Sequence, residues 1–100
     1  MQTIKATDFL DSRRDIVESA AILADALVER INQGGGVEIS LAGLKGIPSI
    51  YFNVVLLRLA EAFGPEVLEN QVKFQFSSES QRYVFERSLD AVRKSLIQKT

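Results

Sequence analysis

The stretch LAGLKGIPSIYFN, residues 41–53, decides the fold because it joins a strand pattern to a helix pattern through a turn with two glycines and a proline. Before it, residues 37–41 alternate between apolar and polar side chains, which is typical of a strand with one buried face. After it, residues 49–63 are apolar nearly all round and end at Gly64-Pro65, which is typical of a buried helix. The turn therefore predicts a strand-to-helix step of an α/β fold.

The same two patterns occur on both sides of this unit. Residues 16–31 carry apolar side chains every three or four positions, which predicts an amphipathic helix that ends at the glycines 34–36. A short strand is expected at residues 2–6 and a clearer one at residues 72–76. The segment Ser78-Glu79-Ser80-Gln81 has the form of a capping box, so the last helix should begin there.

The resulting order β-α-β-α-β-α over residues 1–100 predicts a single α/β domain, a two-layer sandwich whose sheet is mostly parallel with right-handed crossovers. Strands covered on both faces would be apolar throughout, whereas these strands alternate. We therefore expect all three helices on one face of the sheet, with the helix of residues 49–63 in the middle. The other face should carry the polar residues Glu38, Ser40, Lys73 and Gln75.

The composition narrows the classes of function. The chain has 100 residues, 46% of them apolar and 25% charged, as expected for one globular domain. Its net charge of −1 gives no sign of nucleic-acid or membrane-surface binding. Because the sequence contains no cysteine and no histidine, disulfides, thiolate nucleophiles and a Ser-His-Asp triad are excluded within it. We expect no catalytic residue, no metal site and no cofactor.

The N-terminal residues have no apolar core of signal-peptide length. The longest apolar run, residues 50–57, is far shorter than the ~20 residues that a membrane span needs. A cytoplasmic protein is expected.

The run VEISLAGLKGIPSIYFNVVLLRLAEAFGPEVLENQVKFQFSSESQRYVFERSL, residues 37–89, resembles the STAS-like domains of unknown function found in bacterial proteins. Those domains are relatives of the STAS domains of anti-sigma factor antagonists. The resemblance lies in the strand end Ser40–Gly43, the turn of residues 44–48 and the helix start Ser49–Phe52. The strand and helix of residues 71–89 are similar as well, and the similarity covers roughly residues 13–95.

The resemblance implies a domain that docks to another protein, typically a histidine-kinase-like ATPase. In STAS antagonists, an Asp-Ser-Ser-Gly turn carries a serine that the partner kinase phosphorylates. Carried over, these four positions fall on Pro48, Ser49, Ile50 and Tyr51, so that the acceptor position holds Ile50. In the STAS-like group the helix start more often reads Ser-Phe, which places the serine position at Tyr51. Ser49 and Tyr51 are therefore the candidate phosphoacceptors.

The residues of the turn also have simpler interpretations. Gly43, Gly46 and Ser49 stand before a helix start, as in phosphate-binding loops, but Lys45–Pro48 lacks the Gly-Lys-Ser/Thr order of a P-loop, and a plain turn is favoured. For Ser49, the role of an N-cap is favoured over that of a phosphoacceptor, because capping alone accounts for a serine at a helix start. The cluster of Asp8, Asp11 and Asp15 fits the start of the first helix, where the helix dipole favours negative charge.

We predict a non-enzymatic protein–protein interaction module, with a docking surface on the turn and on the neighbouring helix start, residues 77–82. Apolar residues at the turn are either part of this surface or part of the core. The predicted partner-binding residues are Lys45, Ile47, Ser49, Ile50, Tyr51, Phe52, Ser77 and Ser78. Two alternatives stay open: a small-molecule or nucleotide-binding subunit that uses the same pocket, and a self-assembling homodimer.

Overall fold

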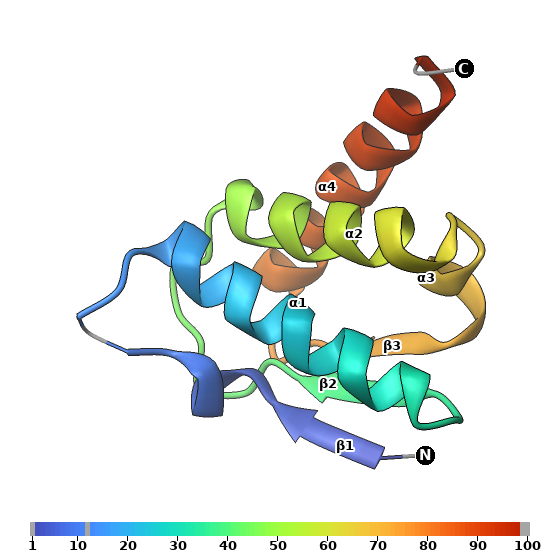
Figure 1. The fold of residues 1–100 in the computed structure, drawn as a ribbon. Helices are drawn as coiled ribbons and strands as arrows, with labels where there is room; N and C mark the ends of the chain where they lie inside the picture. Colours follow the sequence, from blue (N-terminus) through green and yellow to red (C-terminus); the bar gives the residue numbers. More distant parts are fainter. Residues whose placement is uncertain (1, 12, 99–100) are drawn as a thin grey trace.

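The computed structural model describes residues 2–11 and 13–98, which share one hydrophobic core. These residues form three strands, four α-helices and one 3-10 helix, η1. In chain order the elements are β1 (Gln2–Lys5), η1 (Ala6–Phe9), α1 (Ile16–Asn32), β2 (Val37–Ser40), α2 (Ser49–Phe63), α3 (Val67–Asn70), β3 (Val72–Gln75) and α4 (Glu79–Gln98), as drawn in Figure 1. The predicted α/β class and the alternation of strands and long helices are confirmed.

The sheet is parallel and follows chain order, β1-β2-β3. Ile4, Ile39 and Phe74 are register partners on the face toward the helices. Figure 1 shows α1, α2 and α4 on the same side of the sheet, which agrees with the expected layering. The other face is polar: Thr3, Lys5, Lys73 and Gln75 are exposed, and Glu38 and Ser40 are half-buried.

Helix α2 lies between α1 and α4 and contacts both, which explains why its sequence is apolar nearly all round. Phe52 is completely buried, and burying a side chain of this size contributes ~1.5–3 kcal/mol. Its ring packs edge-on against Phe74 of β3 and Phe85 of α4, with centroid distances of 6.1 and 5.5 Å. This aromatic cluster holds α2, β3 and α4 together below the turn.

The helix ends follow local chemistry. The Asp15 carboxylate caps α1 by accepting a hydrogen bond of 2.8 Å from the backbone N–H of Glu18. The N-cap of α2 is Pro48, whose extended backbone makes Ser49 the first helical residue. The prediction that Ser49 is the N-cap is therefore wrong, because the cap position is one residue earlier. Gly64 ends α2 with φ at 91°, a conformation that favours glycine.

Two short elements escaped the sequence prediction. Both η1 and α3 are four residues long, which is too short for a helical period to show. The strand predicted at residues 2–6 ends at Lys5, because Ala6 already belongs to η1. None of the helices in the described ranges is long and apolar enough to span a bilayer.

Candidate functional site

The turn after β2 and the loop before α4 meet at one edge of the sheet, because the carboxyl ends of parallel strands lie together. The strand pairing continues past β2, where the backbone N–H of Leu41 donates to the Gln75 carbonyl at 3.0 Å. Within the turn, Gly43 and Gly46 have φ values of 88° and 60°, the left-handed region that glycine reaches most easily. Leu41 and Leu44 are buried and fix the turn to the core.

Gln81 connects the turn to the start of α4. Its side-chain Nε2 donates hydrogen bonds to the carbonyl oxygens of Leu41 and Leu44, at 3.1 and 3.0 Å. Its Oε1 accepts a bond of 2.8 Å from the Ser77 backbone N–H. The side chain is buried, and these three bonds use both amide donors and give the amide oxygen a partner in a low-dielectric setting. One amide thus fixes the turn against α4.

Half of the predicted capping box is present. The Ser78 hydroxyl accepts a hydrogen bond of 3.1 Å from the Gln81 backbone N–H, as the motif requires. The Gln81 side chain, however, turns to Ser77 and to the β2–α2 turn rather than to the Ser78 backbone. The Gln81 side chain, which the capping-box motif predicts in a local cap, therefore forms long-range hydrogen bonds to the turn instead.

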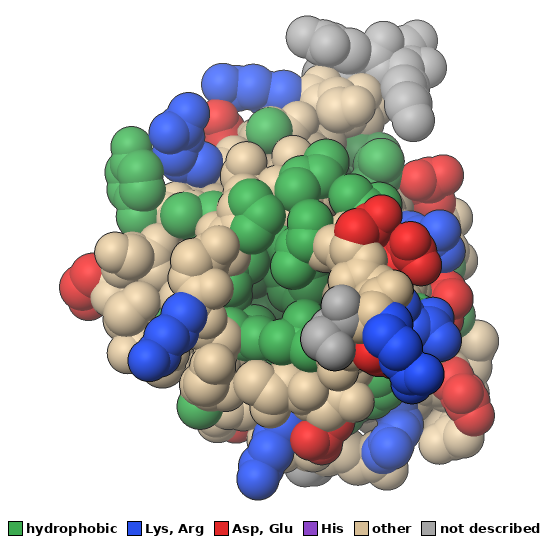
Figure 2. All heavy atoms as spheres, turned by 90° about the vertical axis from the view of Figure 1, so that its left-hand side faces the viewer, with side chains coloured by type: hydrophobic (Ala, Val, Ile, Leu, Met, Phe, Trp, Pro, Cys, Tyr) green, Lys and Arg blue, Asp and Glu red, His purple; other side chains and the backbone are tan. Residues whose placement is uncertain are grey.

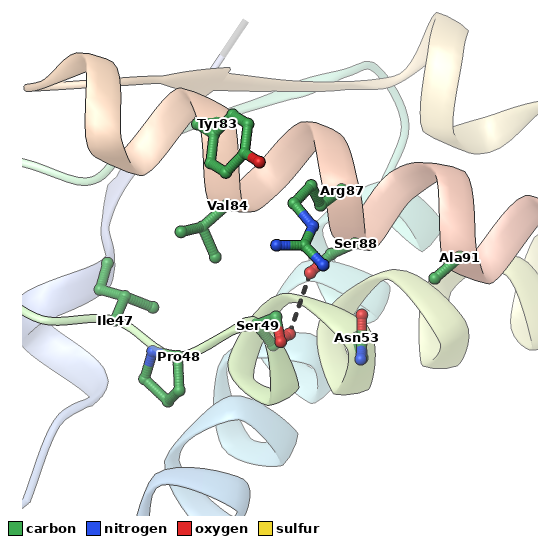
Figure 3. A pocket seen from close by; sticks show the side chains of 9 residues that line it. All are labelled: Ile47, Pro48, Ser49, Asn53, Tyr83, Val84, Arg87, Ser88 and Ala91. Atoms are coloured by element: carbon green, nitrogen blue, oxygen red, sulfur yellow. Dashed lines mark hydrogen bonds between the residues drawn. The ribbon is translucent and has the colours of Figure 1, made fainter.

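A second hydrogen bond between α4 and the preceding part of the chain lies two helical turns further along α4. The hydroxyl of Ser88, which is buried, donates to the carbonyl oxygen of Ser49 at 3.0 Å, as the dashed line in Figure 3 marks. Figure 3 shows the first turn of α2 facing the side chains of Val84 and Ser88 on α4. The turn and the beginning of α2 are thus held against the same helix at two points.

Two adjoining pockets lie between the turn and α4. The larger, of about 520 Å³, lies between residues 43–47 and residues 77–84. The smaller, of about 290 Å³, lies between residues 47–53 and residues 83–91 and is drawn in Figure 3. Ile47 and Val84 line both pockets. We call the two pockets together the turn–helix groove.

The groove is mainly apolar and carries positive charge. Lys45 lines the larger pocket and Arg87 the smaller one, and no acidic residue of the described chain lines either. The Arg87 guanidinium lies 5.8 Å from the ring centroid of Tyr83, one helical turn before it, within cation–π distance. Tyr83 is 62% exposed and Ile50, at the start of α2, is 43% exposed. These are large apolar side chains to leave in water.

Figure 2 shows the molecule from the side on which the turn and the start of α2 lie. Hydrophobic side chains gather in a hollow at the centre of this face, and charged side chains of both signs lie around it. An apolar hollow with a charged rim is the usual form of a docking surface.

Two polar atoms of α2 are buried without a hydrogen-bond partner among the described residues, the Tyr51 hydroxyl and Asn53 Oδ1. Asn53 lines the smaller pocket. Tyr51 is 1% exposed, and this burial raises the pKa of its hydroxyl to about 12, because the phenolate would lose its hydration.

Most of the predicted site residues come together in the groove. Lys45, Ile47, Ser49, Ser77 and Ser78 line it. Ile50 is exposed beside Ser49, although it does not line either pocket.

Tyr51 and Phe52 correct the expected surface. Both are predicted partner-binding residues, but they are 1% and 0% exposed and belong to the core: the Phe52 ring packs against Phe74 and Phe85, and the Tyr51 ring packs edge-on against Phe52. The hydroxyl of Tyr51 is out of reach of a kinase in this structure. Ser49 is exposed and is the accessible one of the two candidate phosphoacceptors.

The contribution of α4 to the groove beyond its first turn is not predicted by the sequence. Tyr83 and Arg87 are four residues apart, as are Val84 and Ser88, so each pair lies on one face of the helix. The available signal for a contact on this face was Ser88, a small polar residue that directly precedes the apolar Leu89. Its partner at Ser49 could not be identified from spacing alone.

No protein-family model, no curated protein and no solved structure matches this chain. Function is therefore inferred from the chemistry of the groove and from the sequence pattern.

Proposed function

We propose that this chain is a STAS-like protein–protein interaction module without catalytic activity, and that the turn–helix groove is its docking surface. The observation that carries the proposal is the exposure of Tyr83 and Ile50, 62% and 43%, beside an apolar groove. Covering such side chains removes apolar area from water, and a tyrosine anchor is a common centre of binding energy at interfaces.

The resemblance to STAS domains supports a histidine-kinase-like ATPase as the partner, with Ser49 as the candidate phosphoacceptor. Ser49 is exposed and lines the smaller pocket together with Arg87. A phosphate on Ser49 would add a charge of about −1.5 to −2 beside this guanidinium, which can bind phosphate through paired hydrogen bonds. Phosphorylation would then neutralise one cation of the groove and change its affinity for a partner.

A second function, small-molecule binding in the same groove, is favoured by Asn53. Its buried Oδ1 lacks a partner in the described part of the chain, and a ligand that donates a hydrogen bond could satisfy it. A thermal-shift screen with nucleotides and small metabolites tests this function, because a ligand that binds only the folded protein raises its melting temperature.

The docking proposal is tested by photo-crosslinking in the host cell. A photoreactive amino acid replaces Tyr83 in the groove or, as the matched control, Lys73 on the open sheet face; both positions are exposed. After illumination, mass spectrometry identifies the adducts. We expect adducts with a second protein from position 83 and none from position 73.

The identity of the adduct separates the functions. A kinase-like ATPase attached at position 83 supports the proposal in full. Adducts with further copies of this chain would favour the self-assembling homodimer, and light scattering on the purified protein would then show an oligomer. An absence of adducts at position 83, or equal adducts at positions 73 and 83, contradicts the docking proposal.

A further inference from the structure

The two cations of the turn–helix groove are not neutralised within the described part of the chain. Among the described residues, the cations that form ion pairs all lie outside the groove: Arg13, Arg14, Arg58, Arg93 and Lys94. Lys45 and Arg87 are exposed and form no such pair. Since the whole chain has a net charge of −1, the positive character of the groove is local.

This charge distribution indicates the chemistry of the partner. On the basis of the proposed function, we infer that the groove binds a short acidic segment of another protein, whose apolar side chains fill the two pockets while its carboxylates face Lys45 and Arg87. Complementary charge at the rim of an interface suppresses wrong partners and speeds association. The shared Ile47 and Val84 walls provide the apolar contact between the two cations.

The dimensions of the groove limit the length of the segment. Its α4 wall runs from Ser80 to Ala91, roughly 16 Å at the rise per residue of an α-helix. That length corresponds to about five extended or eleven helical residues.

The other common polyanion, a nucleic acid, fits less well. Duplex binding depends on the neutralisation of several phosphates by Lys and Arg, and single-strand binding uses a positively charged groove that follows the backbone. Among the described residues, only two cations line this groove, and its lining is predominantly apolar. A protein segment is therefore the better match.

The test uses a phage-displayed library of random peptides of about twelve residues, selected against the intact protein. Three proteins are compared: the natural chain, the Lys45→Glu, Arg87→Glu double variant, and Lys73→Glu as a charge-reversal control on the open sheet face. All three positions are exposed, so each protein should fold, which circular dichroism and a melting curve check.

We expect peptides selected on the natural chain to be enriched in Asp and Glu over Lys and Arg by about two- to fivefold, around conserved apolar anchors. The double variant should lose or reverse this preference, and Lys73→Glu should keep it. Selection of neutral or basic peptides, an acidic preference that survives the double variant, or no selection at all would overturn the inference. So would displacement of a selected peptide by an equal concentration of a single-stranded oligonucleotide.

The crosslinking and peptide-selection experiments distinguish failure of the proposed function from failure of the inference on partner chemistry. A protein crosslinked at position 83 together with no acidic preference overturns the inference on partner chemistry and leaves the docking function standing. No crosslink at position 83 overturns the docking function itself.

Discussion

The hydroxyl of Ser88 donates a hydrogen bond of 3.0 Å to the carbonyl oxygen of Ser49, which lies 39 positions earlier in the chain. Through this bond, the middle of α4 is fixed to the first residue of α2, directly beside the smaller pocket. The shape of the groove therefore depends on a contact between side chain and backbone that is remote in sequence.

Replacing Ser88 by alanine should lower the free energy of unfolding by ~1 kcal/mol, the usual net contribution of one hydrogen bond. Urea denaturation measures the change. The control is Ser80→Ala on the same helix, since Ser80 is exposed and the same hydroxyl is removed there without loss of a buried group. Equal stability of the two variants would show that the bond contributes nothing.

Replacing Gln81 by alanine should cost more, ~2–3 kcal/mol, because the buried carbonyl groups of Leu41 and Leu44 then lose a donor. Chemical denaturation measures the loss, and amide hydrogen exchange should show that the turn after β2 becomes less protected. The exposed Gln71 provides the control variant Gln71→Ala, for which a change within about 0.5 kcal/mol is expected. Unchanged hydrogen-exchange protection of the turn in Gln81→Ala would mean that the buried side chains of Leu41 and Leu44 are sufficient to hold the turn in place.

The buried hydroxyl of Tyr51 should make stability fall at high pH. Its pKa is raised from 10.0 to about 12 in the folded protein, so above pH 10 the unfolded chain binds fewer protons than the native one. The contribution is fully present below pH 10 and is lost as the pH rises through about 12, by roughly 3 kcal/mol in all.

The comparison of Tyr51→Phe with Tyr83→Phe isolates this effect, because Tyr83 is 62% exposed. Tyr51→Phe should be at least as stable as the natural protein at neutral pH, since an unpartnered buried hydroxyl is removed, and should resist alkaline unfolding better. Tyr83→Phe should follow the natural pH profile. Identical alkaline profiles of Tyr51→Phe and the natural protein would exclude Tyr51 as the responsible group.

Gly43→Ala should destabilise the fold by ~1–2 kcal/mol, because φ at this position is 88°. In addition, a Cβ atom there would lie 3.2 Å from Cγ2 of Thr7. Gly35→Ala is the matched variant, with the same φ of 88° and no atom within 4 Å of the added carbon. Denaturation of both variants separates backbone strain from crowding, and Gly35→Ala should be the milder change.

The regular part of the fold could be predicted because its signal is periodic and local. Apolar spacing located α1, α2 and α4, and alternation along Val37–Ser40 and Val72–Gln75 located two strands and their polar face. The alternation also predicted helices on a single face, as Figure 1 shows. The short helices η1 and α3 carry no such period.

The candidate site was only partly predictable, because its decisive contacts are long-range. The sequence places Lys45 and Ile47 in a turn, and it places Ser78 at a helix start, but it does not show that Gln81 reaches the turn across about forty positions. Nor does it separate Ile50, which is exposed, from Tyr51 and Phe52, which are buried. One residue of helix rotation decides between surface and core, and only packing fixes that rotation.

The two ends of the parallel sheet differ in how well they should tolerate an inserted segment. The groove lies at the carboxyl ends of the strands, whereas the loop of residues 33–36 enters β2 at its amino end, which is the opposite, right-hand end of the sheet in Figure 1. Gly34 and Gly35 are exposed, with open space around them. A fluorophore, an affinity tag or a whole fused domain inserted between these glycines would therefore leave the groove unobstructed.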